Sequence, residues 1–374
     1  MQKELTRRRF LSLLAAGVAV AITGCRAESV LGPRAALEPE AAGSAPVPRP
    51  LTPEPTVQPS PTPVTVRPAP KDIAPPPMKF TPLSEFYIQH YDRIPDVDIS
   101  TWRLRIDGLV ENPITLTYDE VRALPAKTFV WTLECISNPA GGNLIGNQVW
   151  KGTPLVPLLE EAGIKPEAIR VRWYAADGYS NSLPLERVLH PDSMLVYEMN
   201  ERPLPREHGY PLRVLIPGHY GQKMPKWLER IELIDNEYQG YWERRGWSDM
   251  ATIKPNSRID IPGRASQIAL GERLIIEGVA MSDESGVARV DVGIEDREGN
   301  VVWVDTVRTQ GENPYTWTVW RTAWTPERPG KYRVYARTTD GQGRTQRKGK
   351  GSLLGGAFPA GSDEMHVIVV NVKG

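Results

Sequence analysis

Apolar and polar residues alternate in the first half of the chain in the way that predicts β-strands. Trp102, Leu104 and Ile106 alternate with the charged residues between them. Side chains at every second position of a strand share one face, so this pattern predicts a strand with one buried face. The same argument predicts further strands over residues 129–133, 169–174 and 212–216.

Two helices are expected between these strands. Thr117 and Glu120 have the spacing of a capping box, which predicts a short helix that ends before Pro125. Thr153 and Pro154 predict a second helix, with Thr as its N-cap and Pro at its first position. Residues 81–249 are therefore expected to form a mixed α+β domain.

From about residue 250 the pattern changes to short strands separated by turn residues. This spacing is typical of an immunoglobulin-like β-sandwich over residues 250–374, although it lacks the cysteine pair of antibody domains. The expected strands cover residues 273–277, 288–294, 301–304, 315–320, 331–336 and 365–370.

Residues 1–25 have the features of an export signal. Arg7, Arg8 and Arg9 precede a short apolar run, as in twin-arginine signals, and the run ends in a lipobox-like sequence at Cys25. We expect Cys25 to be lipidated and the protein to be anchored to the membrane, facing outside the cytoplasm. The proline-rich residues 26–80 have too few apolar side chains for a core and are predicted to be an extended tether.

The overall composition and charge argue against some classes of function. Lys and Arg number 45, as do Asp and Glu, so the formal net charge is zero. No excess of cations is available to neutralise phosphates, which argues against a nucleic-acid binder. The chain has 2 cysteines, so lipidation of Cys25 would leave Cys135 as the remaining thiol.

Cys135 is the most informative single residue. It follows an alternating strand and precedes a loop broken by Pro139, Gly141 and Gly142. A thiol at the end of a buried strand and at the mouth of a loop can be a nucleophile, a metal ligand or a packed core residue. The position alone leaves these three roles open.

Several motifs that occur in order along the chain resemble the sulfite oxidase family of molybdopterin enzymes. They are Thr132-Leu-Glu-Cys135, Trp150-Lys-Gly-Thr-Pro-Leu155, Tyr197-Glu-Met-Asn200, Pro203-Leu-Pro205, His208-Gly-Tyr-Pro-Leu-Arg213 and Lys226-Trp227. The resemblance implies a molybdopterin-binding domain followed by the β-sandwich, which often serves dimerisation in that family. It also implies that Cys135 is the thiolate ligand of molybdenum, a role that needs no Cys/His cluster because the pterin supplies the other sulfur ligands.

The resemblance also implies roles for other residues. His208, Arg213 and Lys226 would hold the pterin and its phosphate, with Lys223 nearby, and Asp177 would contact the pterin ring. Tyr197 would be the active-site tyrosine. Apart from the resemblance, His90 and Gln89 are expected to line the entrance to the site, with His90 counted among the cofactor-binding residues. Each also has an ordinary structural interpretation: a solvated cation, a turn residue or a buried core tyrosine.

The implied reaction is oxygen-atom transfer on a small sulfur compound such as sulfite, with electrons exchanged with an external acceptor such as a cytochrome. The chain has no haem motif and no cysteine set for an iron–sulfur cluster. Gln89 and Ala140 stand where family sulfite oxidases carry arginines, and Lys348 or Lys350 falls near a third. Sulfoxide reduction, or a non-catalytic tethered binding protein, are the alternatives.

Overall fold

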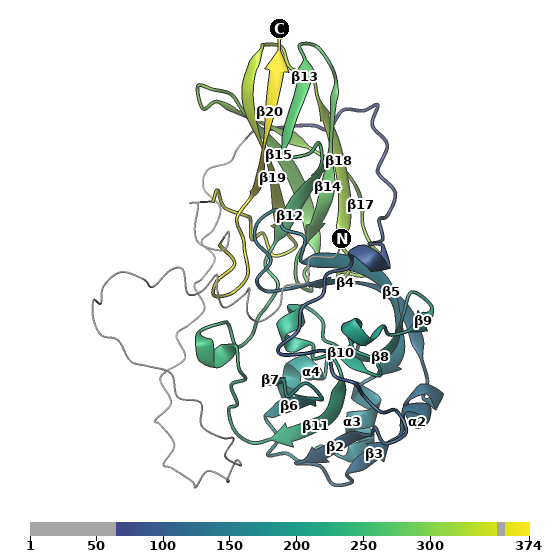
Figure 1. The fold of residues 1–374 in the computed structure, drawn as a ribbon. Helices are drawn as coiled ribbons and strands as arrows, with labels where there is room; N and C mark the ends of the chain where they lie inside the picture. The colour runs from purple at the N-terminus through teal and green to yellow at the C-terminus, as the bar shows by residue number, and fades with distance from the viewer. Residues whose placement is uncertain (1–64, 350–355) are drawn as a thin grey trace, which may run out of the picture.

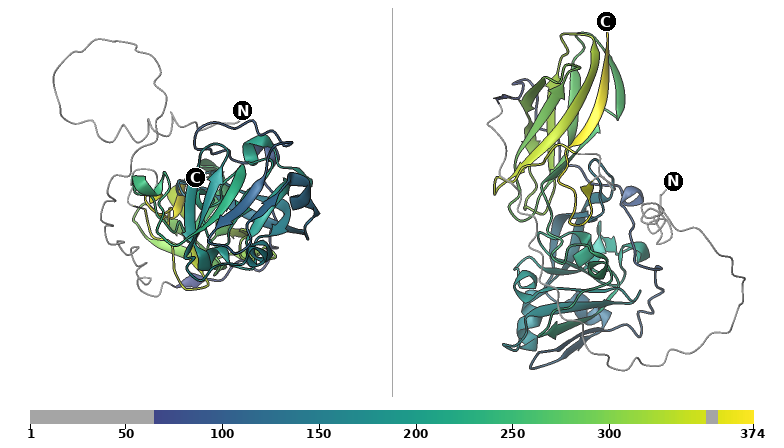
Figure 2. Two further views of the ribbon diagram at one scale, coloured as in Figure 1. Left: turned by 90° about the horizontal axis from the view of Figure 1, so that it is seen from below. Right: turned by 90° about the vertical axis from the view of Figure 1, so that its left-hand side faces the viewer.

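The computed structural model describes residues 65–349 and 356–374. These residues form two units placed end to end, as the ribbon and its rotated views show (Figures 1 and 2). Cys25, the export signal, the first part of the predicted tether and Lys350 lie outside the described residues. No helix among the described residues is long and apolar enough to cross a membrane.

The first unit contains two five-stranded sheets that share a hydrophobic core with the flanking helices. One sheet has the order β10 (Arg213–Leu215), β8 (Met194–Met199), β5 (Ile145–Pro154) and β4 (Lys127–Glu134), with β9 (Arg202–Pro203) paired to β8. The other has the order β3 (Ile114–Leu116), β2 (Leu104–Gly108), β11 (Leu228–Ile234), β6 (Arg170–Ala175) and β7 (Ser180–Pro184). The helices are α2 (Tyr118–Ala123), α3 (Val156–Ala162) and α4 (Leu185–Val188).

One helix start was predicted correctly and the other was not. The Thr117 side chain accepts a hydrogen bond from the Glu120 backbone, and the reciprocal bond is also present, so the capping box opens α2. Thr153 and Pro154 instead belong to β5, where they pair with β8, and α3 begins at Val156. Strand pairing at this position outweighs the local helix signal.

The second unit is a pair of packed sheets with a common core. The four-stranded sheet has the order β12 (Asn256–Ile261), β14 (Leu274–Met281), β18 (Thr318–Trp324) and β17 (Val307–Thr309). The six-stranded sheet has the order β1 (Val66–Arg67), β16 (Val301–Asp305), β15 (Val287–Glu295), β19 (Gly330–Asp340), β20 (His366–Lys373) and β13 (Ala265–Ala269). The strand predicted over 315–320 is shifted toward the C-terminus, and β12, β13 and β17 were not predicted.

Residues 65–80, the last part of the predicted extended tether, are bound to the second unit and are here called the strap. Its β1 pairs in parallel with β16. Thr309 donates a hydrogen bond to the carbonyl of Pro76, and the indole of Trp317 donates to that of Lys79 at 3.0 Å. The strap has few apolar side chains, but its backbone forms hydrogen bonds with the second unit.

Candidate functional site

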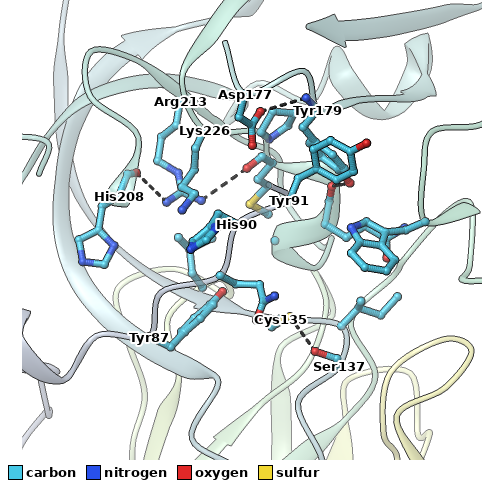
Figure 3. A pocket seen from close by; sticks show the side chains of 18 of the residues that line it. Tyr87, His90, Tyr91, Cys135, Ser137, Asp177, Tyr179, His208, Arg213 and Lys226 are labelled. Atoms are coloured by element: carbon cyan, nitrogen blue, oxygen red, sulfur yellow. Dashed lines mark hydrogen bonds between the residues drawn. The ribbon is translucent and has the colours of Figure 1, made fainter. Parts of the chain in front are cut away.

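A cavity opens in the first unit at the end of β4. Its empty volume is about 880 Å³, including the part open to solvent. The sequence-predicted residues that line it are Gln89, His90, Cys135, Asp177, His208, Arg213 and Lys226. Segments that are far apart in the sequence thus converge on one site (Figure 3).

Cys135 immediately follows β4, as the sequence predicted. Its backbone N–H donates to Leu144 at 2.9 Å, and its sulfur lies 3.1 Å from the Ser137 hydroxyl. Burial raises the pKa of the thiol. Within the described residues, no three His, Cys, Asp or Glu side chains form a group that could hold a metal ion. A metal bound at Cys135 would therefore take its remaining ligands from a cofactor.

The basic residues gather on one side of the cavity, away from Ser137 (Figure 3). The Arg213 guanidinium donates to the His208 carbonyl at 3.1 Å, and the Lys226 ammonium donates to the Glu207 carbonyl at 2.6 Å. Neither forms an ion pair with a carboxylate in the part of the chain that the structure describes. Arg213 Nε and His208 Nε2 are buried there without a hydrogen-bond partner.

The electrostatics of this side favour an anion. Burial lowers the pKa of Arg213 to about 10, and burial together with Arg213 lowers the pKa of Lys226 to about 7. Burial lowers the pKa of His208 to about 3, so its ring is neutral near pH 7. Buried cations without counter-charges are costly unless an anion binds them. A phosphate-bearing cofactor therefore fits this donor set.

Asp177 and His90 complete the predicted residues in the cavity. Burial raises the pKa of the Asp177 carboxyl, which also accepts a hydrogen bond from the Tyr179 backbone at 3.0 Å. His90 Nδ1 lies 2.9 Å from the Asp92 carbonyl. Gln89 also lines the cavity, but Ala140 lies in a separate small pocket beside Asn256 and Arg258.

Three predicted residues lie outside the cavity. The fully buried Lys223 pairs with Glu243 at 2.6 Å and donates to the Ser182 carbonyl, so it is a structural cation and does not reach the cofactor site. Tyr197 shares a face of β8 with Leu195 and packs in the core of the first unit, which corrects its assignment to the active site. Lys348 pairs with Glu295 at 2.8 Å, in the second unit.

Sequence reasoning gave no site role to the aromatic residues of the cavity, which are Phe86, Tyr87, Tyr91, Tyr179, Trp227, Trp242 and Trp247. Tyr179 donates its phenolic hydrogen to the Gln222 carbonyl at 2.9 Å and lies beside Asp177. A signal for it was present: it follows Asp177-Gly178, a turn at the end of β6 in which Gly178 has a φ of 79°. Residues at such strand ends commonly build sites.

Comparison with known proteins agrees with this arrangement. Residues 90–242 match the oxidoreductase molybdopterin binding domain family. The oxidoreductase YuiH of Bacillus subtilis is 34% identical over 165 residues, which cover 44% of this chain and 81% of that protein. The mitochondrial sulfite oxidase of Drosophila melanogaster is 29% identical over 313 residues, covering 70% of this chain and 54% of the fly protein.

A solved structure shares the fold. The sulfane dehydrogenase SoxCD from Paracoccus pantotrophus superposes with a TM-score of 0.63 at 25% identity, covering 76% of this chain and 81% of that one. The chain spans about half the length of the fly relative. The matched domain, these relatives and the lone thiol opposite buried cations show together that the chain belongs to the sulfite oxidase family of molybdopterin oxidoreductases.

Proposed function

We propose that the protein transfers an oxygen atom to or from a small sulfur-containing substrate and exchanges electrons with an external acceptor. The observation that carries this proposal is the placement of Cys135 in one cavity with the unpaired cations Arg213 and Lys226. A soft thiolate suits molybdenum, and buried cations suit the phosphate of its pterin.

Each lining residue has a definite task in this proposal. Cys135 would be the protein's ligand to molybdenum, and because burial raises the pKa of the thiol, metal binding would release its proton. Arg213, Lys226 and His208 would hold the phosphate, and Asp177 would accept hydrogen bonds from the pterin ring. The bound cofactor supplies oxygen-atom transfer and two-electron redox chemistry.

The electrons need a partner outside the chain. Sulfite oxidation would follow SO₃²⁻ + H₂O → SO₄²⁻ + 2H⁺ + 2e⁻, and the two electrons would leave to an external protein such as a cytochrome. Two cysteines are too few for an iron–sulfur cluster, and the sequence has no haem attachment motif. Sulfoxide reduction would run the electron flow in the opposite direction.

Export and assembly are also part of the proposal. The signal at residues 1–25 and the lipobox at Cys25 support twin-arginine export followed by lipid anchoring. The packed sheets of the second unit support an immunoglobulin-like sandwich, and we propose that it can mediate a homodimer. Replacing Cys25 by Ser should release the protein from membranes; retention in the membrane fraction would contradict the lipid anchor.

Metal analysis tests the proposed function. The protein is purified with its export route intact, and molybdenum is measured by mass spectrometry in wild type and Cys135→Ala. We expect about one molybdenum per wild-type chain and a large loss in the variant. Absence of metal from wild type would rule out the enzyme. Metal without sulfite-dependent cytochrome reduction would rule out sulfite alone.

A further inference from the structure

Four of the aromatic side chains that line the cavity are here called the collar: Tyr91, Tyr179, Trp242 and Trp247. The Tyr91 ring centroid lies 5.8 Å from that of Tyr179 and 4.7 Å from that of Tyr241. Tyr241 in turn lies 4.8 Å from Trp242, edge to face. Tyr241 thus links two residues of the collar, Tyr91 and Trp242, through aromatic contacts.

Buried ion pairs hold the loop that carries both tryptophans. Lys223 and Glu243 are 2.6 Å apart, with side chains 0% and 1% exposed. Gln222 donates to the same Glu243 oxygen at 2.9 Å. Arg170 holds Asp249, at the end of the loop, at 2.8 Å. Breaking a buried pair by removing one partner is strongly destabilising, so this network fixes the position of Trp242 and Trp247.

Charge is distributed unevenly around the cavity. Arg213 and Lys226 lie together on one side, whereas Tyr91 and Tyr179 lie on the other (Figure 3). Asp177 lies beside Tyr179 and accepts a hydrogen bond from its backbone, so the collar side carries a carboxyl group and no Lys or Arg is labelled there; Gln89, Ile136 and Ser137 are uncharged members of the lining. A buried dianion needs cations in contact, whereas aromatic faces bind apolar groups. The cationic side is the part that suits the cofactor phosphate.

We infer that the collar binds an apolar substituent of the substrate, so that the substrate is an uncharged organic sulfur compound. Lys223 and Glu243 act as positioning residues, because they set the collar without lining the cavity. This inference rests on the proposed function for the reaction at the substrate's sulfur atom. Its prediction that the collar binds an apolar substituent is tested separately.

Calorimetric titration tests the collar. Methyl phenyl sulfoxide and sodium sulfate are titrated into the full-length protein, both as purified and in a cofactor-free form from cells that do not make molybdopterin, in which Arg213 and Lys226 are open to sulfate. We expect Trp242→Ala to weaken sulfoxide binding by about tenfold, as the loss of one aromatic contact implies, and to leave sulfate binding unchanged. Trp324→Phe, in the second unit, is the matched control and should alter neither. Equal binding of the sulfoxide by wild type and Trp242→Ala would overturn the inference.

The ion pair is tested by a single and a double variant. Lys223→Met leaves Glu243 buried without its partner and should weaken sulfoxide binding more than sulfate binding. The double variant Lys223→Met/Glu243→Met removes both charges and should restore part of the sulfoxide affinity. If the single variant does not fold, the double variant can still be compared with wild type. Equal losses of both ligands in a folded variant would mean general damage and contradict the positioning role. Neither titration depends on molybdenum, so a failure of the proposed function is seen separately in the metal content.

Discussion

At the scale of single residues, the buried Arg213 and the partly buried Lys226 explain how the cavity can favour an anion. Arg213 keeps its charge near neutral pH because its pKa is lowered only to about 10. Lys226 differs, because burial and its neighbour Arg213 bring its pKa to about 7. One of the two cations therefore changes its charge within the physiological range.

This difference predicts a pH dependence of anion binding. The cofactor-free protein, prepared from cells that do not make molybdopterin, should gain more thermal stability from sulfate at pH 6 than at pH 8.5. Protonated Lys226 attracts the anion, so this part of the stabilisation is present below a pH of about 7 and is lost as the pH rises above that value. Bound sulfate raises the pKa of Lys226, which moves the loss to a somewhat higher pH. The measurement is Tm with and without sulfate.

Two variants of Lys226 distinguish this explanation from a general effect of pH. Lys226→Arg keeps a permanent charge and should remove most of the difference between the two pH values. Lys226→Met should reduce the sulfate effect at pH 6. An unchanged pH dependence in both variants would assign the titration to another group.

A second prediction concerns the charge of the substrate side. Gln89 lines the cavity as an uncharged residue. Gln89→Arg adds a guanidinium there and should tighten sulfate binding by about tenfold or more, because charge-assisted hydrogen bonds are stronger than neutral ones. Calorimetry measures the change, with Gln89→Met as the control of similar size. No gain in the arginine variant would show that this part of the cavity is inaccessible to anions.

Residue identity could be predicted where a motif and a strand end coincided. Cys135 is such a residue, and it lines the same cavity as Arg213 and Lys226, which were predicted from motifs alone. Tyr197 was proposed from its match to a family motif, and such a match does not say which of the two faces of a strand meets the cavity. Lys223 was misplaced because a cation beside a Gly-rich loop gives no sign of a carboxylate partner that lies 20 residues further along the chain.

At the scale of elements, the position of the strap on the second unit could not be predicted from its amino-acid composition. Its proline-rich sequence is typical of a free spacer, and only the structure places β1 on the edge of the six-stranded sheet. β1 pairs with Trp303 and Val304 of β16, next to the exposed Val301 and Val302 of the same strand. An uncovered edge with apolar residues is a site for association between chains.

Truncation tests the contribution of the strap. A chain that begins at residue 81 should unfold about 5 °C or more below one that begins at residue 65, because it lacks several backbone hydrogen bonds that each contribute about 1 kcal/mol. It should also associate more readily at high concentration. Calorimetry and light scattering measure the two effects. Equal Tm values would show that the strap does not contribute to the stability of the second unit.

At the scale of the whole molecule, the second unit helps to shape the loop after Cys135. Ile136 packs in a cluster with Trp317 and Val319 of the sandwich. Asn256 donates to the buried Glu134 carboxylate at 2.9 Å, and Arg258 donates to the Gly142 carbonyl at 3.2 Å. The sandwich is therefore part of the site's framework in addition to any role in dimerisation.

Gly141 provides the sharpest test of this dependence, because it lies where the loop meets the second unit. A Cβ atom added there would lie 2.0 Å from the His366 ring, and the backbone φ of 69° already disfavours other residues. Gly141→Ala should therefore move the loop, lower Tm and reduce the molybdenum content. The control is Gly178→Ala, because Gly178 also has a positive φ but has open space around it. This control should lose only about 1–2 kcal/mol of folding free energy through backbone strain. Gly141→Ala/His366→Ala removes the clash and should recover part of the metal content. If the double variant is no better than Gly141→Ala, backbone strain alone accounts for the loss and the sandwich does not determine the shape of the loop.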